Sequence, residues 1–225
     1  PTKFLNFPRF GAVNVHASLL PKYRGGAPIH YAIMNGDKET GVTIMRMVAK
    51  MDAGAIISQR AIPITGEDDV ASMFEKLSVV GADLLIETLP ALFAGTITEV
   101  EQDEALVSFS PNISREQEQI DWNKTAAEVD CFVRGLRPWP TSFTILNGNR
   151  VKMWGVALTD KQTTKAPGSL FVEGGRLYVA CGGGTVLEIT RLQPAGKAQM
   201  DAKAFINGFS EWLKNNAIFE GLNHE

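Results

Sequence analysis

The pattern of apolar residues changes near residue 111, and this change limits the folds open to the chain more than any other feature. Before it, short apolar runs alternate with segments of helical periodicity, whereas afterwards short β segments follow one another closely. Alternating strands and helices indicate an α/β layer. Closely spaced strands separated by turn residues are typical of a small barrel, here of the oligonucleotide-binding type. We therefore expect two domains, each able to bury a core within the 225 residues.

The first part should contain strands and helices in alternation, followed by a connecting segment. Pro28 is suited to the first position of a helix that Gly36 would end. The long helical pattern contains Pro90, which predicts either one helix or a break between two. Residues 95–111 carry scattered acids without periodicity, and we interpret them as a linker. The predicted strands cover 11–17, 40–48 and 55–62, and the predicted helices cover 29–35 and 69–93.

The second part should form a barrel framed by two helices. Asn147-Gly148-Asn149 and Glu173-Gly174-Gly175 are hairpin turn sequences between alternating apolar segments. A helix over 124–135, capped by Asn123 or Thr125, should precede the strands, and a helix over 202–213 should follow them. The predicted strands cover 142–146, 150–158, 168–172, 176–180 and 185–192.

Composition excludes several classes of protein. With 44% hydrophobic and 21% charged residues the chain is typical of soluble globular proteins. It shows neither an apolar run of membrane-spanning length nor a leader, so we expect a cytoplasmic protein without membrane contact. Cys131 and Cys181 are far apart and should be buried thiols, and the three histidines show no metal-ligand spacing. A net charge of −3 is not that of a general nucleic-acid binder, so an RNA partner would need a local basic patch.

Three polar residues are candidates for catalysis. Asn14 and His16 lie two apart on a predicted strand, so their side chains share one face and could together stabilise an oxyanion. Asp52 precedes a Gly turn, and a carboxylate beside His16 would favour the charged imidazolium. The alternative is structural: Asn14 and His16 would satisfy backbone groups of the following loop, and Asp52 would cap its turn.

The loop after the first strand is a candidate binding element. Ser18-Leu19-Leu20-Pro21 is followed by a basic, glycine-containing turn, Lys22-Tyr23-Arg24-Gly25-Gly26. Free backbone amides in such a loop can bind the polar edge of a flat ring. The alternative is a plain connection between strand and helix with a basic surface.

Four motifs in one order distinguish these alternatives, because their conjunction is improbable by chance. Together they resemble the 10-formyltetrahydrofolate-dependent formyltransferase family. The motifs are Asn14-x-His16-x-Ser18-Leu19-Leu20-Pro21, Arg24-Gly25-Gly26-Ala27-Pro28-Ile29, Gly41-Val42-Thr43-Ile44 and Asp52-x-Gly54.

The resemblance implies a fold and a site. Residues 1–94 would be the C-terminal portion of a Rossmann-like catalytic domain, and 112–225 an open β-barrel domain that binds tRNA. Asn14 and His16 would hold the formyl oxygen, and Asp52 would orient and charge His16 and help manage the proton on the attacking amine. Ser18, Leu19, Leu20 and Pro21 would line the tetrahydrofolate site. The co-substrate would be 10-formyltetrahydrofolate, and no metal is implied.

The acceptor follows from the branch of the family that the chain is most similar to. The run from Arg24 to Ile29, together with Ile120-Asp121-Trp122 and Arg137-Pro138-Trp139-Pro140, looks like the methionyl-tRNA branch. This implies transfer of a formyl group to the amino group of methionyl-initiator tRNA, in translation initiation, with no protein partner. The candidates for tRNA contact, by charge and position, are Arg137, Arg150, Lys152 and Lys197.

Two points qualify this expectation. The family's catalytic domain begins with strands and helices that precede the Asn14 strand, so we expect the chain to be part of a longer protein and to be inactive alone. The competing acceptor is an amino sugar nucleotide, and a folate-dependent hydrolase ranks third. A module that only binds RNA, with an inactive α/β part, is the alternative from another class.

Overall fold

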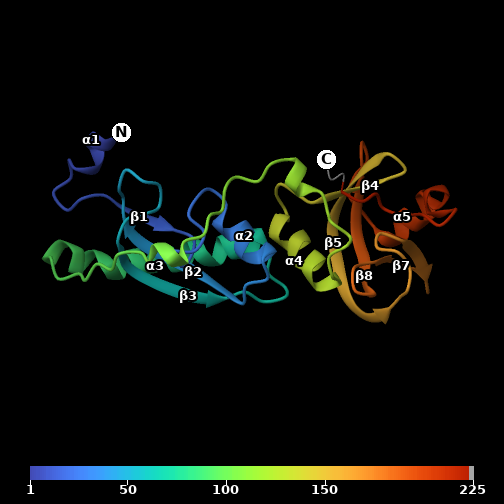
Figure 1. Ribbon diagram of the computed structural model, residues 1–225, viewed down its shortest axis with the longest axis horizontal. Coiled ribbons are helices and arrows are strands. Elements are labelled where there is room, and N and C mark those ends of the chain that lie inside the picture. The colour runs from blue at the N-terminus through green and yellow to red at the C-terminus, as the bar shows by residue number, and fades with distance from the viewer. Residues whose placement is uncertain (223–225) are drawn as a thin grey trace. The chain divides into compact units, whose positions relative to one another are not determined.

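The computed structural model describes residues 1–222, and contacts divide the chain into two compact units. The first unit contains residues 1–33 and 37–113, and the second contains 34–36 and the chain from 114 onward. Each unit has its own hydrophobic core. Figure 1 shows a β-sheet in the first unit and a strongly curved sheet in the second.

The sheet of the first unit is antiparallel. It has the order β1-β2-β3, where β1 covers Val13–His16, β2 covers Glu39–Arg46 and β3 covers Ile56–Pro63. A short helix, α1 (Thr2–Leu5), precedes the sheet, and α2 (Pro28–Met34) connects β1 to β2. The predicted α/β character is confirmed, although none of these strands forms the parallel pairs of a doubly wound sheet.

One long helix, α3 (Val70–Ala94), covers a face of this sheet (Figure 1). It begins with a capping box between Asp69 and Ser72 and ends at Gly95, which has a left-handed conformation. Pro90 does not break it: the proline is exposed and close to the helix end, so the carbonyl group that it leaves unpaired can face water.

Among residues 1–222, α3 is the one helix that is long and apolar enough to cross a membrane by length and composition. The expectation that no segment reaches this length was therefore wrong. The core helices of soluble proteins share this length and composition. Met73, Leu77 and Leu84 of α3 lie in the core with Val42 and Ile44 of the sheet.

Residues 95–111, the predicted linker, make several contacts within the first unit. Val100 pairs with Ile56, and Phe109 forms a parallel bridge with Arg24. A 3-10 turn, η1 (Glu104–Leu106), lies between these two contacts. Weak periodicity in the sequence did not reveal this packing, because the segment bonds through isolated backbone and side-chain groups instead of a regular strand.

The second unit is an open barrel that a further segment bridges. Its strands run in the order β4-β5-β8-β7-β6, with β9 on β8, and residues near 217–220 bridge Leu146 and Ser169. Both predicted hairpins are confirmed, since Asn147-Gly148 and Gly174-Gly175 are two-residue turns with positive φ. The strands are β4 (Phe143–Leu146), β5 (Asn149–Gln162), β6 (Leu170–Glu173), β7 (Arg176–Ala180), β8 (Thr185–Pro194) and β9 (Met200–Asp201).

Helices frame this barrel. The capping box of Thr125 and Glu128 begins α4 (Ala126–Leu136), after the short turn η2 (Glu116–Glu118). The predicted final helix is shorter than expected: α5 (Ala202–Gly208) ends at a glycine, and η3 (Ser210–Leu213) follows. Burial raises the pKa of the Cys181 thiol to about 12, whereas Cys131 is only partly buried.

A buried carboxylate secures the start of α3. Asp68 is 2% exposed, and burial alone would raise the pKa of its carboxyl group. Hydrogen bonds from Lys76, at 2.8 Å, and from Thr65 and Ser72 outweigh burial, so this pKa is about 2 instead of the ordinary 3.8.

We predict that Asp68→Asn lowers the free energy of unfolding near neutral pH by on the order of 2 kcal/mol. Because the folded-state pKa lies below the unfolded value, the contribution is complete well above pH 3.8 and disappears as the pH falls toward about 2. Urea unfolding from about pH 7 to about pH 3 should show the difference narrowing below about pH 4. Asp83→Asn, at an exposed position of α3, is the control. A difference that stays constant down to about pH 3 would contradict the linkage.

Candidate active site

Strand β1 places Asn14 and His16 on the same face of the sheet. Their cross-strand partners on β2 are Met45 and Thr43, respectively. The intervening Val15 points to the other face, because successive side chains of a strand alternate. This face is therefore polar beside β1, as the spacing of the two residues indicates.

The His16 ring is 6% exposed and fixed from both sides. Its Nε2 lies 2.8 Å from the carbonyl oxygen of Tyr23, and its Nδ1 lies 3.8 Å from Oδ2 of Asp52. A carbonyl group only accepts hydrogen bonds, so Nε2 must carry a proton in this contact. The ring atom that remains for other partners is Nδ1, and the Asp52 carboxylate faces it.

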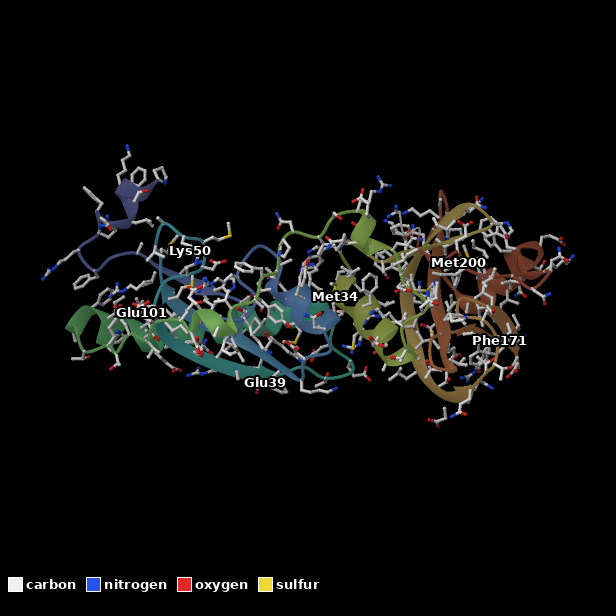
Figure 2. All side chains as sticks on the ribbon, in the orientation of Figure 1. Met34, Glu39, Lys50, Glu101, Phe171 and Met200 are labelled. Atoms are coloured by element: carbon white, nitrogen blue, oxygen red, sulfur yellow. The ribbon has the colours of Figure 1, made fainter. Side chains whose placement is uncertain are left out.

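Asp52 occupies a turn in which two hydrogen bonds hold it. Its Oδ2 accepts a hydrogen bond of 2.8 Å from the Gly25 N–H, and its carbonyl oxygen accepts one of 2.7 Å from Nε2 of Gln102. Its φ of 53° is uncommon for a residue with a side chain. Figure 2 labels Lys50 in the same loop between β2 and β3.

Asn14 differs from the other two residues. Its side chain is half-buried, and within residues 1–222 its amide has no hydrogen-bond partner. The amide is therefore available to a ligand. By contrast, His16 bonds to the Tyr23 carbonyl, and Asp52 accepts from the Gly25 N–H. Both residues therefore also satisfy backbone groups of the loops, as the structural alternative expects.

The Ser18 to Pro21 stretch uses its polar groups internally. The Ser18 hydroxyl is fully buried and donates to the Lys22 carbonyl at 2.6 Å, and the Thr43 hydroxyl donates to the Ser18 carbonyl. The Leu20 N–H donates to that same Thr43 hydroxyl, and Gln59 donates to the Leu20 carbonyl. This loop is therefore fixed in shape, and Ser18 has no free hydroxyl to offer.

Tyr23 carries the strain of the loop. Its φ is 62°, which is unfavourable for a bulky residue. Such a conformation persists when the surroundings fix it. Here Ser108 accepts from its N–H, Asp37 accepts from its hydroxyl group at 2.7 Å, and its carbonyl accepts from both His16 and Ser110.

Sequence reasoning missed the residues that support this loop from the segment 100–110. Gln102, Ser108 and Ser110 bond to the two loops that carry Tyr23 and Asp52. They lie some fifty to ninety residues away in sequence, with separations of 50, 85 and 87. No local pattern could have indicated them.

A basic concavity lies on the second unit. It has a volume of about 460 Å³, and its lining includes Arg115, Arg150 and Lys152 with the acid Glu118. Glu118 pairs with Arg150 at 3.3 Å, so Arg115 and Lys152 keep most of the free charge. Of the four candidates for tRNA contact, the structure brings Arg150 and Lys152 together here. Arg137 instead donates to the Trp154 carbonyl.

No metal group is present among residues 1–222, where no cluster of three or more His, Cys, Asp or Glu could hold an ion.

Family profiles match both parts of the chain. The family described as formyl transferase matches residues 1–89, and the C-terminal domain of formyl transferases matches residues 112–210. The chain thus contains both characteristic domains of a formyltransferase.

Curated relatives narrow the assignment. Methionyl-tRNA formyltransferase of Enterococcus faecalis is 60% identical over 212 residues, or 94% of this chain and 68% of the relative. The enzyme of Levilactobacillus brevis is 55% identical over 95% of this chain and 68% of its own length. That of Listeria innocua is 49% identical over 97% of this chain and 70% of its own length. The chain belongs to the methionyl-tRNA formyltransferase family and spans about two thirds of these relatives.

Solved structures share the fold at lower identity. A crystal structure of HypX from Aquifex aeolicus in complex with tetrahydrofolic acid matches 90% of this chain and 35% of its own, with a TM-score of 0.66 and 18% identity. The N-formyltransferase from Helicobacter canadensis, in complex with folinic acid and dTDP-3-aminofucose, matches 81% of this chain and 65% of its own chain. The TM-score is 0.66 and the sequence identity is 22%. At this identity the comparison shows the fold alone.

We predict that Gly54→Ala disrupts the turn that carries Asp52. A Cβ at this position would lie 1.8 Å from the carbonyl oxygen of Arg46, so the backbone would have to move. The substitution should lower the free energy of unfolding by more than about 2 kcal/mol. Chemical denaturation measures this, with Gly66→Ala as the control, since nothing lies within 4 Å of a Cβ there. Equal stabilities for the two variants would contradict the steric argument.

Proposed function

We propose that the protein containing this chain transfers the formyl group of 10-formyltetrahydrofolate to the amino group of methionyl-initiator tRNA. The observation that carries the proposal is the Asn14, His16 and Asp52 constellation, with a free amide and a ring nitrogen facing a carboxylate. It occurs in a chain of the methionyl-tRNA formyltransferase family. The product initiates protein synthesis, and the cytoplasm is the compartment that this role requires.

The reaction is an attack on a formyl carbon. The amine nitrogen of the methionyl group bonds to that carbon, and the π electrons of the carbonyl move to its oxygen. The Asn14 amide, which has no other partner in the described chain, donates to this oxyanion. When the carbonyl reforms, the bond to the folate nitrogen breaks and its electron pair returns to that nitrogen.

His16 manages a proton through Nδ1. Since Nε2 is committed to the Tyr23 carbonyl, Nδ1–H of the protonated ring is the second donor to the oxyanion. The attacking amine loses one proton, which Asp52 helps to take up, and the folate nitrogen gains one, so no net proton is consumed. His16 or a water molecule delivers that proton to the folate nitrogen.

Asp52 orients and charges His16. Its carboxylate stabilises the imidazolium at 3.8 Å, while the Gly25 N–H fixes the position of Oδ2. Removing this charge would leave the ring without its electrostatic partner. We therefore assign Asp52 the role of orienting His16 and of providing the opposite charge beside its ring.

The folate is expected to lie against Ser18, Leu19, Leu20 and Pro21. Because the Ser18 hydroxyl is fully buried and bonded to Lys22, this stretch would offer apolar surface and a fixed shape instead of a hydroxyl contact. The hydrogen bonds from Thr43 and Gln59 hold that shape in advance of binding.

The tRNA is expected to contact the second unit. We propose that residues 1–94 belong to the catalytic domain, that 95–111 connect it in sequence to the next domain, and that 112–225 form the tRNA-binding domain. The concavity with Arg115 and Lys152 supplies the local positive charge that the overall composition lacks.

The first test is formyl transfer to charged initiator tRNA by the full-length protein that contains these residues. His16→Ala should lower turnover by about 10²- to 10⁴-fold with little change in thermal stability, because an essential proton carrier and oxyanion donor is lost. His30→Ala, in α2, is the matched control. Near-normal turnover of His16→Ala would remove His16 from the mechanism.

The same assay separates the acceptors. A dTDP-linked amino sugar, offered with the same formyl donor, should not be formylated. Transfer to the sugar and none to tRNA would overturn the proposed acceptor while leaving the chemistry of the formyl group intact. Affinity for uncharged and charged tRNA alike, without transfer, would instead favour a binding module.

We predict that Lys152→Gln weakens tRNA binding and reduces its salt dependence. The slope of log K against log salt should fall by about one unit if Lys152 neutralises one phosphate. Lys161→Gln on the same strand is the control, since Lys161 is paired with Glu173 at 2.8 Å. Titrations of tRNA at several salt concentrations measure both slopes, and identical slopes for the wild type and Lys152→Gln would exclude a phosphate contact at Lys152.

A further inference from the structure

Gln102 reaches the Asp52 turn from a distant part of the chain. It follows Val100, which pairs with Ile56, and its side chain is 8% exposed. A buried amide group must find hydrogen-bond partners, and Gln102 finds all of them around the candidate site.

Both ends of this amide are bonded. Nε2 donates to the carbonyl oxygens of Asp52, at 2.7 Å, and of Gly54, at 2.9 Å. Oε1 accepts from Nε of Arg24 at 3.0 Å. The side chain thus bridges the turn that carries Asp52 and the loop that presents the Gly25 N–H to the Asp52 carboxylate.

Arg24 fixes the orientation of the Gln102 amide. A guanidinium only donates, so its neighbour must be Oε1, and Nε2 must face the two carbonyl groups. Arg24 is 1% exposed, and its Nη2 donates to Glu104 at 3.0 Å. Its Nη1 is the one buried side-chain nitrogen or oxygen without a hydrogen-bond partner in the described chain. Leaving this buried donor without a partner costs stability, so the other contacts of Arg24 must hold the guanidinium in place.

We propose that Gln102, oriented by Arg24, is a positioning residue that holds Asp52 at the distance from His16 that the transfer requires. The expected effects on kcat rest on the proposed function. Asp52 has a φ of 53°, which its own backbone does not favour, so an external contact must maintain it. The bridge from Gln102 to the carbonyl groups on both sides of Ala53 is that contact.

Gln102→Glu is the sharpest test in the full-length protein. It keeps the length of the side chain and the acceptor for Arg24, but presents a carboxylate oxygen where two carbonyl groups need a donor. We expect kcat to fall by about 10- to 100-fold, because small displacements of a catalytic group have effects of this size. The KM for methionyl-tRNA should change by less than about 2-fold. Gln102→Met, which adds no charge, should show the same pattern if the glutamate variant does not fold.

A double-mutant cycle separates positioning from stability. In an Asp52→Asn background, Gln102→Glu should reduce kcat by less than about 2-fold further, since its effect passes through Asp52. Thr88→Val is the matched control: Thr88 is also 8% exposed and hydrogen-bonded, but it lies on α3 beside Ser58. That variant should lose stability and keep kcat. Equal losses of kcat from Gln102→Glu in both backgrounds would overturn the proposal.

A second readout does not depend on activity. The Gly25 amide hydrogen is bonded to Asp52, and NMR can follow its exchange with solvent. This exchange should become faster in Gln102→Glu and in Gln102→Met. In Thr88→Val it should change only as much as the global stability of the protein changes. Unchanged Gly25 exchange in both Gln102 variants would overturn the positioning role. Absence of formyl transfer by the unmodified protein would instead overturn the proposed function, and Gly25 exchange would then decide the role of Gln102 alone.

Discussion

The hydrogen bond from the Gly25 N–H to the Asp52 carboxylate joins the two loops on which the candidate site depends. One loop follows β1 and carries the Tyr23 carbonyl that holds His16, and the other connects β2 to β3. Neither loop has a regular structure to fix it. Their geometry must therefore come from side-chain and backbone hydrogen bonds in a protected environment, where each bond is stronger than in water.

The segment around residues 100–110 supplies much of that environment. Ser108 and Ser110 bond to Tyr23, whose φ of 62° is strained, and Gln102 bonds to Asp52, whose φ is also positive. Both of these residues contact His16, Tyr23 through its carbonyl group and Asp52 through its carboxylate. Strain concentrated at such a place fits a site in which function, and not stability, determines the conformation.

The residues of the candidate site differ in how much of their hydrogen-bonding capacity remains for a ligand. His16 and Asp52 spend part of their hydrogen-bonding capacity on the loops, which fixes their positions before any ligand binds. Asn14 keeps its amide free, and Nδ1 of His16 faces the carboxylate. Preorganised hydrogen-bond donors are the arrangement that stabilisation of an oxyanion calls for, and the Asp52 carboxylate favours the charged form of the His16 donor. The family assignment gives this arrangement its substrate, since the curated relatives are methionyl-tRNA formyltransferases.

Local sequence signals predicted the type of the longer helices and strands and the residues that share a face of β1. Period-two alternation placed Asn14 with His16, and the Asn147-Gly148 and Gly174-Gly175 pairs fixed two hairpins, because these signals depend on neighbouring residues only. Only the tertiary structure decided that β1, β2 and β3 pair in antiparallel fashion, that Ser18 has no free hydroxyl, and that Gln102 and Arg24 support Asp52. These features depend on contacts between residues far apart in sequence, and no local propensity encodes such contacts.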